Sequence, residues 1–558
     1  MRMRFLILLG IPAIVLFRCG GEAPPLAGGT STGSETTNGL VATAIMADST
    51  PAANAAVRLR PAGYLAETPL PALRKRMVSR ADAITDSRGR FFLDSISPGE
   101  YRIEVNDRES TAILLTCVVD ESSDSVVDLG TAVLQRFATL SGAVRAAGSL
   151  PPASVGVFGL ERRAAVDSGT GGWRIDDLPA GDFRLRIEPE SDEYGAAVID
   201  APYVSAGDSA SLDTTTLVSY TGEDYSAWTY SRAVRINTTA SGADVTDDVH
   251  NFPLLLRLDS AALDFAQTAP DGRDIRFSKS DGTPLRYEID FWDAYFGHAA
   301  VWVLMDTVRG NDSTQSITMY WGGPADAPDF SSPSAVFDTA NGHAMVWHVN
   351  ETGAGDLGVI RDVTVNGVHG QSNMPGRPYS VAGRIGGAMS LGYPANHIDT
   401  VTMHASRSRA IAFRQASFTI SLWARRYQGG YAIVYAPGYA YRPQLLDHQT
   451  LSLTNQNDSH AFISRADAVG DPAGWNLYHA VVNRSDNTVS FYTNGKAIGT
   501  ESIADTLGAL KSAGLFAVIG DARVDLDEIR MSAVARNEGW IQLCHVSQRE
   551  GADVVSFR

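Results

Sequence analysis

Short stretches in which apolar and polar side chains alternate recur along this chain, and they constrain its fold more than any other feature. Residues 285–291 (LRYEIDF) and 418–422 (FTISL) both make every second side chain apolar. Successive side chains of a strand point to opposite faces, so such a stretch buries one face of a sheet. Asn494 and Gly495 separate two further stretches and favour a two-residue hairpin. We therefore expect an all-β protein made of β-sandwiches.

The length of the chain, 558 residues, is enough for about three to five separate cores. Hydrophobic residues make up 44% and charged residues 20%, which is typical of globular domains. The formal net charge is −17, and the one basic run is residues 74–76. Nucleic acid is therefore not an expected partner, because phosphate binding needs clustered Lys and Arg.

The N-terminus predicts export and a lipid anchor. An apolar run at residues 5–17, too short to span a membrane, follows two arginines and precedes Cys19. Residues 1–19 resemble a bacterial lipoprotein signal, which implies lipidation of Cys19, although Arg18 departs from the small residue that the family prefers there. Gly20 stands where an aspartate would resemble an inner-membrane retention signal, which favours the outer membrane and possible exposure at the cell surface.

A flexible linker is expected at residues 20–37, which are rich in Gly, Ser, Thr and Pro. Its GTSTG (29–33) matches a serine-hydrolase pattern but lacks the strand and helix that such an elbow needs.

Two stretches then repeat one pattern: DSRGRFFLDSISPGEYRIEV at 86–105 and DSGTGGWRIDDLPAGDFRLRIE at 167–188. Each has a turn, an apolar strand, a Pro/Gly turn and an alternating strand. The copies resemble carboxypeptidase-regulatory-like β-sandwiches over residues 38–135 and, more weakly, 138–218. This resemblance implies spacers without catalytic residues.

The second half of the chain contains two more units. Residues 226–345, with DGRDIRFSKSDGTPLRYEIDFWD and VWVLMDTVRGNDSTQSITMYWG, resemble the bacterial domain of unknown function numbered 2341. Residues 347–558 resemble a laminin-G-like or concanavalin A-like jelly roll through SFTISLWARR, WNLYHAVVNRSDNTVSFYTNGKAIG and VDLDEIRMS. The second resemblance implies a lectin-like binding domain at the end of the chain, projected outward by the preceding domains.

The stretch YEIDFWD at 287–293 contains the main candidate for catalysis, because it resembles the EIDxxE strand of laminarinases and lichenases. A regular strand places Glu288 and Asp290 on one face, about 6.6 Å apart along the backbone. Retaining hydrolases need carboxyl groups about 5 to 5.5 Å apart, which that motif achieves with a bulge. The alternation signals no bulge here, and Asp293 replaces the third acid. We expect Arg286, Glu288 and Asp290 on one exposed strand face, where they make cross-strand ion pairs; a glycoside hydrolase using Glu288 and Asp290 or Asp293 stays as the alternative.

In VDLDEIRM every second residue is apolar, but the apolar positions shift by one residue near Asp527 and Glu528. This shift predicts a bend or bulge. A re-aimed Asp527 could be a calcium ligand, but calcium takes about six to eight oxygens, and a structural turn held by these two acids is the favoured interpretation. His343 and His348 are expected on opposite sides of a strand, which argues against a shared metal.

Other chemical signatures are missing. The sequence has no HExxH, no paired CxxC and no phosphate-binding loop. Cys117 and Cys544 are expected as small buried hydrophobic residues rather than a disulfide. No catalytic residue and, calcium aside, no cofactor is predicted.

Aromatic residues offer a candidate binding site. In GGYAIVYAPGYAYRP, Tyr439 and Tyr441 follow a Pro-Gly turn and could stack on a sugar, whereas Tyr431 and Tyr435 are expected to pack in a strand. The sequence thus predicts a non-enzymatic, outer-membrane lipoprotein that binds a polysaccharide or cell-surface glycan through its C-terminal domain. A structural adhesin or envelope protein with a protein partner is the second alternative.

Overall fold

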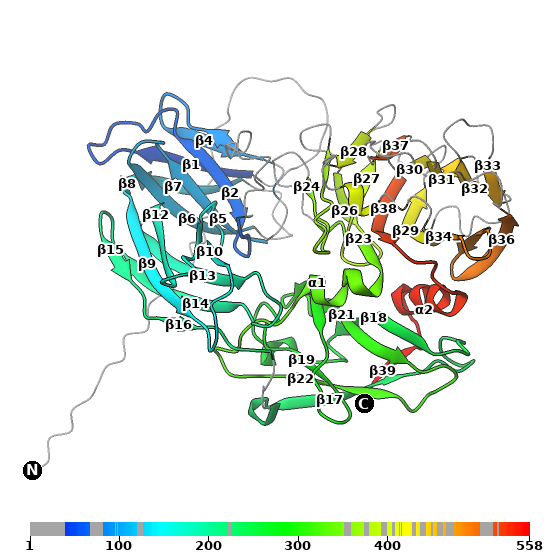
Figure 1. The fold of residues 1–558 in the computed structure, drawn as a ribbon. Coiled ribbons are helices and arrows are strands. Elements are labelled where there is room, and N and C mark those ends of the chain that lie inside the picture. The colour runs from blue at the N-terminus through cyan, green and yellow to red at the C-terminus, as the bar shows by residue number, and fades with distance from the viewer. Residues whose placement is uncertain are drawn as a thin grey trace, which may run out of the picture.

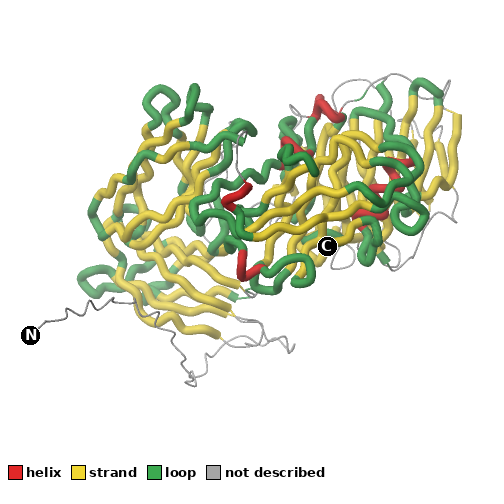
Figure 2. The backbone as a smooth tube through the Cα atoms, turned by 90° about the horizontal axis from the view of Figure 1, so that it is seen from below, coloured by secondary structure: helices red, strands yellow, loops and turns green. Residues whose placement is uncertain are grey.

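Strands account for nearly all the regular structure, so the protein is all-β, as the alternating sequence pattern predicts (Figures 1 and 2). The computed structural model describes residues 39–66, 82–94, 96, 99–119, 126–220, 225–350, 359–372, 379–391, 399–403, 408–411, 413, 416–426, 431–435, 442–447, 450–454, 461–464, 474–502, 517–521 and 524–558.

The first unit is a sandwich of the sheets β4-β1-β7 and β3-β2-β5-β6-β8. Its strands are β1 (Gly39–Ile45), β2 (Ala56–Pro61), β3 (Ala83–Ile84), β4 (Arg90–Leu93), β5 (Gly99–Asn106), β6 (Thr111–Val119), β7 (Val126–Val133) and β8 (Gln135–Arg136). Alternate side chains of these strands meet in one core, which includes Leu40, Val57, Phe91 and Ile103.

The second unit repeats this strand order, with the sheets β12-β9-β15 and β11-β10-β13-β14. In both units the first strand pairs antiparallel with one neighbour and parallel with the other. The strands are β9 (Ala138–Arg145), β10 (Ala153–Val157), β11 (Arg163–Ala165), β12 (Gly172–Leu178), β13 (Gly181–Pro189), β14 (Ala197–Val204), β15 (Ser209–Ser211) and β16 (Thr215–Thr216). The two sequence repeats therefore occupy equivalent places in two similar sandwiches.

The third unit is a sandwich of the sheets β19-β22-β17-β39 and β18-β21-β20. Its elements are η1 (Tyr225–Ala227), β17 (Tyr230–Ile236), β18 (Val249–Asp259), η2 (Phe265–Gln267), β19 (Arg276–Lys279), β20 (Tyr287–Asp293), β21 (His298–Val308), β22 (Ser316–Trp321), α1 (Pro333–Val336) and η3 (Thr339–Asn341). Its last strand, β39 (Val555–Phe557), comes from the C-terminus and pairs with β17.

The fourth unit contains two large sheets, β26-β27-β38-β29-β34-β35-β36 with β23 added on β38, and β24-β25-β28-β37-β30-β31-β32-β33. The elements are β23 (His343–Trp347), β24 (Val359–Ile360), β25 (Gly370–Ser372), β26 (Tyr379–Ala382), β27 (Gly387–Leu391), β28 (Asp399–Met403), η4 (Ser408–Ile411), β29 (Phe418–Arg426), β30 (Tyr431–Tyr435), β31 (Arg442–Asp447), β32 (Thr450–Thr454), β33 (Ala461–Ser464), β34 (Trp475–Asn483), β35 (Thr488–Thr493), β36 (Lys496–Ser502), β37 (Ala517–Asp521) and β38 (Val524–Ser532).

The predicted hairpin at Asn494 and Gly495 joins β35 to β36, and both residues have positive φ, 51° and 79°. Two consecutive residues with positive φ define the turn type that suits a two-residue hairpin. The prediction of this hairpin is confirmed.

The third and fourth units share a core through α2 (Glu538–Gln548). Asn537 caps this helix by accepting a hydrogen bond from the backbone N–H of Trp540, at 2.8 Å. Its apolar face, with Trp540 and Ile541, joins one core cluster that contains Phe252 from the third unit and Leu477 from the fourth. The two units are thus a single packed body rather than two independent domains.

This packing changes the expected arrangement of the chain. The sequence predicted a jelly roll over 347–558 that projects outward, whereas β39 returns to the sheet of the third unit. Figure 1 shows the fourth unit lying against the third, with the C-terminus on the third unit. No helix of the described residues is long and apolar enough to cross a membrane.

Candidate functional site

The YEIDFWD stretch forms β20, the edge strand of the sheet β18-β21-β20. Leu285 and Tyr287 are buried, as the alternation predicts. Beyond them Ile289 and Phe291 pair with adjacent residues of β21, so that Asp290 is the extra residue of a bulge. The expectation of a regular strand without a bulge is therefore wrong.

A second expectation for β20 is also wrong, because the face that was expected to be exposed is buried. Glu288 is 3% exposed and the side chain of Asp290 is 2% exposed. Arg286, expected on the same face, donates from its guanidinium to the backbone carbonyl of Asp192 and lies over the ring of Tyr220. Alternation within one strand cannot show that a neighbouring unit covers its polar face.

The fourth unit contributes two acids from β38. Arg530 pairs with Ser421 of β29, whereas Asp527 pairs with Trp423, so β38 has one residue too many between them. Glu528 lies in this bulge with a φ of +51°. The predicted bulge is confirmed, and both acids lie inside a buried strand.

His348 connects these acids to those of the third unit. It follows β23, and its Nδ1 lies 2.7 Å from a carboxylate oxygen of Glu528 and 3.8 Å from one of Asp290. Its Nε2 lies 3.3 Å from Glu288. Burial alone would lower the pKa of His348, but the charges of Asp290, Glu528 and Glu288 raise it well above the ordinary value. An imidazolium here donates to one carboxylate from each unit.

Arg530 supplies a second cation. Its Nε and Nη2 lie 2.9 and 2.5 Å from one oxygen of Glu528, and its guanidinium carbon lies 4.3 Å from the ring centre of Trp302. The ring of Trp302 also stacks on His348, at 5.9 Å and 21°. Burial would raise the pKa of Glu528, but the charges of His348 and Arg530 lower it, so Glu528 is ionised.

Asp290 is held in a different state. Its Oδ2 accepts a hydrogen bond from the indole N–H of Trp302 at 3.0 Å, and its Oδ1 accepts one from the amide of Asn350. Burial, together with the charges of Glu528 and Glu288, raises the pKa of Asp290 to about 7 despite the nearby His348. Two carboxyl groups of the cluster thus differ strongly in proton affinity.

Asp527, the predicted calcium ligand, is completely buried beside this cluster. Its Oδ2 accepts the backbone N–H groups of Arg384 at 2.6 Å and Ile385 at 2.9 Å, while Oδ1 has no hydrogen-bond partner among the described residues. Burial and the charge of Glu528 raise its pKa well above the ordinary value. Two N–H donors at Oδ2 suit an acid that holds a backbone turn, and calcium binding at Asp527 stays a prediction.

The atoms of Asp290, His348 and Glu528 that could ligate a metal all lie within 4.8 Å of one another. This is the one such group in the described part of the chain. Each of the three side chains already has a hydrogen-bond partner, and the two cations offset part of the negative charge. The three side chains thus belong to one hydrogen-bonded ion network.

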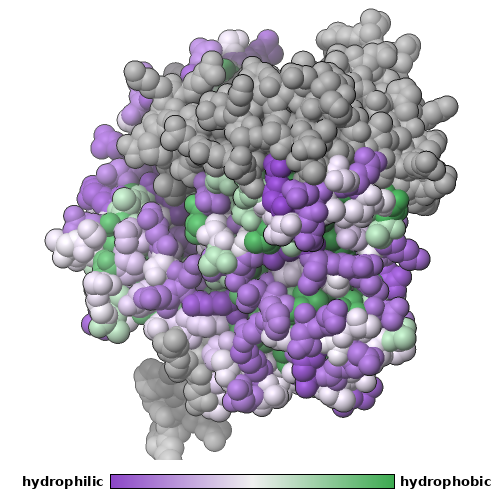
Figure 3. Space-filling model, turned by 45° about the vertical axis from the view of Figure 1, so that its right-hand side comes forward, coloured by the Kyte–Doolittle hydropathy of each residue, from purple (hydrophilic) through white to green (hydrophobic). Residues whose placement is uncertain are grey.

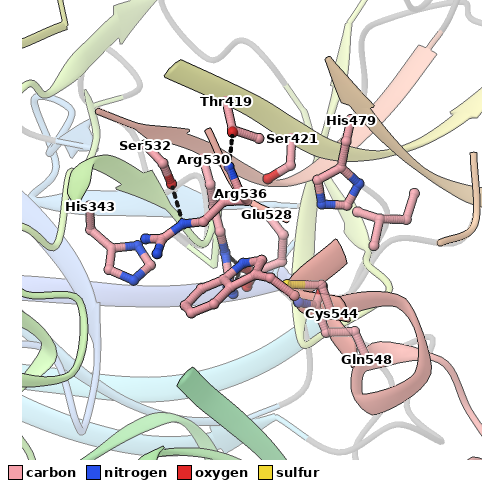
Figure 4. Close-up of a pocket in the computed structure, with 12 residues that line it drawn as sticks. His343, Thr419, Ser421, His479, Glu528, Arg530, Ser532, Arg536, Cys544 and Gln548 are labelled. Atoms are coloured by element: carbon pink, nitrogen blue, oxygen red, sulfur yellow. Dashed lines mark hydrogen bonds and ion pairs between the residues drawn. The ribbon is translucent and has the colours of Figure 1, made fainter. Parts of the chain in front are cut away.

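Access to this network is limited. The adjoining cavity, lined by residues that include Glu528, Arg530, His343 and His479, has a volume of about 20 Å³ (Figure 4). A water molecule needs about 10 to 15 Å³ on this measure, so the cavity holds about one water and no sugar ring. Unequal carboxyl groups are what acid-base catalysis uses, but a polysaccharide cannot reach these.

Two further histidines line this cavity. Figure 4 places His343 and His479 on opposite sides of it. Burial lowers the pKa of His343 well below the ordinary value and that of His479 to about 3, so both are neutral. Both ring nitrogens of His343 lack a hydrogen-bond partner among the described residues.

The remaining predicted residues divide into two groups. Cys19, Tyr439, Tyr441 and the GTSTG stretch lie outside the described residues. Cys117 and Cys544 are buried free thiols, as expected.

Sequence reasoning missed the central role of His348, together with Asn350, Trp302 and Arg530. The polar pair His348 and Asn350, placed directly after the apolar strand β23, was the available signal.

Residues 271–350 match the domain of unknown function DUF2341, in agreement with the resemblance given for 226–345. No curated protein matches the chain.

Among solved structures, similar ones include the binding domain of Paraclostridial Mosquitocidal Protein 1, with 19% identity over 37% of this chain and 52% of that chain, at a TM-score of 0.30. The binding domain of botulinum neurotoxin DC, solved with rat synaptotagmin II, has 15% identity over 38% and 52%, at 0.29. A structure of botulinum neurotoxin type C, a toxin whose cell entry depends on interaction with two ganglioside molecules, is also similar. It has 13% identity over 38% of this chain and 53% of that chain, at a TM-score of 0.29. The chain spans about half the length of these structures, and similarity at this level carries no conclusion about ligand or activity.

Proposed function

We propose that this protein is a non-catalytic cell-surface lipoprotein that binds carbohydrate or another surface component through its C-terminal lectin-like unit. In this proposal Cys19 holds the chain at the outer membrane, and the first two sandwiches act as spacers. The preference for carbohydrate rests on the resemblance to the concanavalin A-like jelly roll.

One observation carries the non-catalytic part of the proposal. The best hydrolase candidates, Glu288 and Asp290, are sealed between the third and fourth units and bound to His348, Asn350 and Trp302. Glycoside hydrolysis needs two carboxyl groups on either side of the scissile bond, with room for the sugar between them. Two carboxyl groups that are almost completely buried and already hydrogen-bonded have no such room.

We expect the full-length protein to be depleted from solution by at least one insoluble polysaccharide, such as cellulose, chitin or β-1,3-glucan, without release of reducing sugar. The assay needs the full chain, because an isolated 347–558 fragment would lose the core that α2 shares with the third unit. Parallel samples with calcium and with chelator test the calcium prediction.

Glu288→Gln is the matched variant for the hydrolase alternative, since it keeps the shape and removes the charge. Sugar release by the wild type that disappears in a folded Glu288→Gln protein would overturn the non-catalytic proposal. Failure to bind any glycan, with capture of a defined envelope protein instead, would favour the adhesin alternative.

A further inference from the structure

The hairpin that joins β20 to β21 carries two exposed aromatic rings at its tip. The side chains of Tyr295 and Phe296 are 89% and 53% exposed, and Tyr295 is the most exposed of the large hydrophobic residues in the described part of the chain. We propose that this tip is a stacking platform for a pyranose ring of a neutral polysaccharide, a contact site additional to the C-terminal unit. The proposal deepens the function proposed above and rests on it.

The backbone of the tip is held in one conformation. The Oδ1 of Asp293, the third acid of the hydrolase alternative, accepts the backbone N–H of Phe296 at 2.9 Å. The backbone carbonyl of Asp293 accepts the N–H of Gly297 at 3.0 Å, and Gly297 has a φ of +70°, which suits glycine. Asp293 therefore stabilises the turn, and the rings of Tyr295 and Phe296 lie at the tip of that turn.

The rings of the tip pack edge to face. Tyr295 and Phe296 have ring centres 5.0 Å apart at an interplanar angle of 89°. Phe291 and His298, at the base of the hairpin, have ring centres 5.0 Å apart at 62°. A platform whose rings are already in contact loses little side-chain freedom when a ligand stacks on it.

The opposite side of the hairpin is anchored to the core. Trp292 contacts Phe265, with ring centres 5.1 Å apart. Gly272 lies so close to Trp292 that a Cβ atom there would come within 2.4 Å of its ring. Trp292 is therefore packed against the core, whereas the exposed ring of Tyr295 is free to contact a ligand.

Size and charge favour a sugar over other occupants. An aromatic side chain buries about 150 to 250 Å², so two rings offer about 500 Å² at most, whereas each partner of a standard protein interface buries about 800 Å². The chain carries a net charge of −17, which disfavours nucleic acid and anionic lipid surfaces. Figure 3 shows one face of the protein on which hydrophilic and intermediate residues predominate, with only scattered hydrophobic patches. A neutral pyranose needs an aromatic face and polar neighbours, and Asp293 and His298 flank the rings.

The test compares Tyr295→Ala, Phe296→Ala and the double variant in the full-length protein. Affinity for the neutral polysaccharide that the wild type binds is expected to fall about tenfold for Tyr295→Ala, and further for the double variant. Melting temperatures should change little, because the side chain of Tyr295 is exposed. Tyr203→Ala in β14, 61% exposed and in the second unit, is the matched control and should bind as the wild type does.

Unchanged affinity of the double variant for the polysaccharide would overturn the proposal of a stacking platform, but it would not contradict the proposed function. Absence of any glycan binding by the wild type would overturn both. Binding to phosphatidylcholine vesicles that the double variant loses, in place of glycan binding, would identify the tip as a membrane contact and would also overturn the proposal.

Discussion

Replacing Arg530 with methionine is expected to lower the free energy of unfolding by about 3 to 5 kcal/mol. Arg530 contacts Glu528, whose side chain is 1% exposed, and lies over the rings of Trp302 and Phe337. Methionine has a similar length and no charge, so the variant leaves Glu528 buried with His348 as its remaining cation. Breaking a buried ion pair from one side costs far more than the pair itself contributes, because the other charge stays desolvated. Urea unfolding measured on the full chain gives this difference directly.

The matched control is Arg174→Met, which removes an ion pair with Asp176 whose side chains are 59% and 52% exposed. Exposed pairs contribute about 1 kcal/mol or less, so this variant should unfold almost as the wild type does. A double variant, Arg530→Met with Glu528→Leu, should recover part of the loss, because it removes both charges. An Arg530→Met protein as stable as the Arg174→Met control would show that the network does not hold the third and fourth units together.

The fold class followed from the sequence because a period of two and turn residues are local properties. The hairpin at Asn494 and Gly495, the buried face at Leu285 and Tyr287, and the bulge near Glu528 were all predicted from residues close together in the chain. The shift of the apolar positions in β38 was informative because a bulge changes the side to which later side chains point.

The burial of Glu288 and Asp290 could not be predicted in the same way. Their face looks like an exposed, polar strand face until the fourth unit is placed on it, and that placement depends on contacts across more than 200 residues of sequence. In most strands the polar residues of an alternating stretch face the solvent. Here they form a charged contact between two packed units. The pairing of β39 with β17 is likewise a long-range contact without a local signal.

Stability is expected to fall as the pH rises above 6.5, because of His348. The folded protein holds the pKa of His348 well above 6.5, so its contribution is complete below pH 6.5 and is lost as the pH rises through the folded value. The pKa of Asp290 is raised to about 7, so its contribution declines between about pH 4 and 7. Above pH 6.5 the titration of His348 lowers the free energy of unfolding by up to about 1.4 kcal/mol per pH unit.

Other groups shape the acid side of the profile. His343 and His479 have pKa values below the ordinary one, so the unfolded chain binds protons that the folded protein does not as the pH falls below 6.5. Glu528, whose pKa is lowered, adds stability above about pH 4.5 that is lost in stronger acid. Both effects destabilise the folded protein on the acid side and oppose the stability that protonated Asp290 gains there.

The measurement that isolates His348 is the difference in unfolding free energy between the wild type and His348→Gln, followed from pH 5.5 to 8.5. This difference should be largest below pH 6.5 and should shrink steadily above it, since only the wild type has a proton to lose at this position. His250→Gln, at an exposed residue that contacts Thr307, is the control for replacing a histidine by glutamine. A difference for His348→Gln that stays constant across the range would mean that folding does not change proton binding at this ring, and it would overturn the prediction.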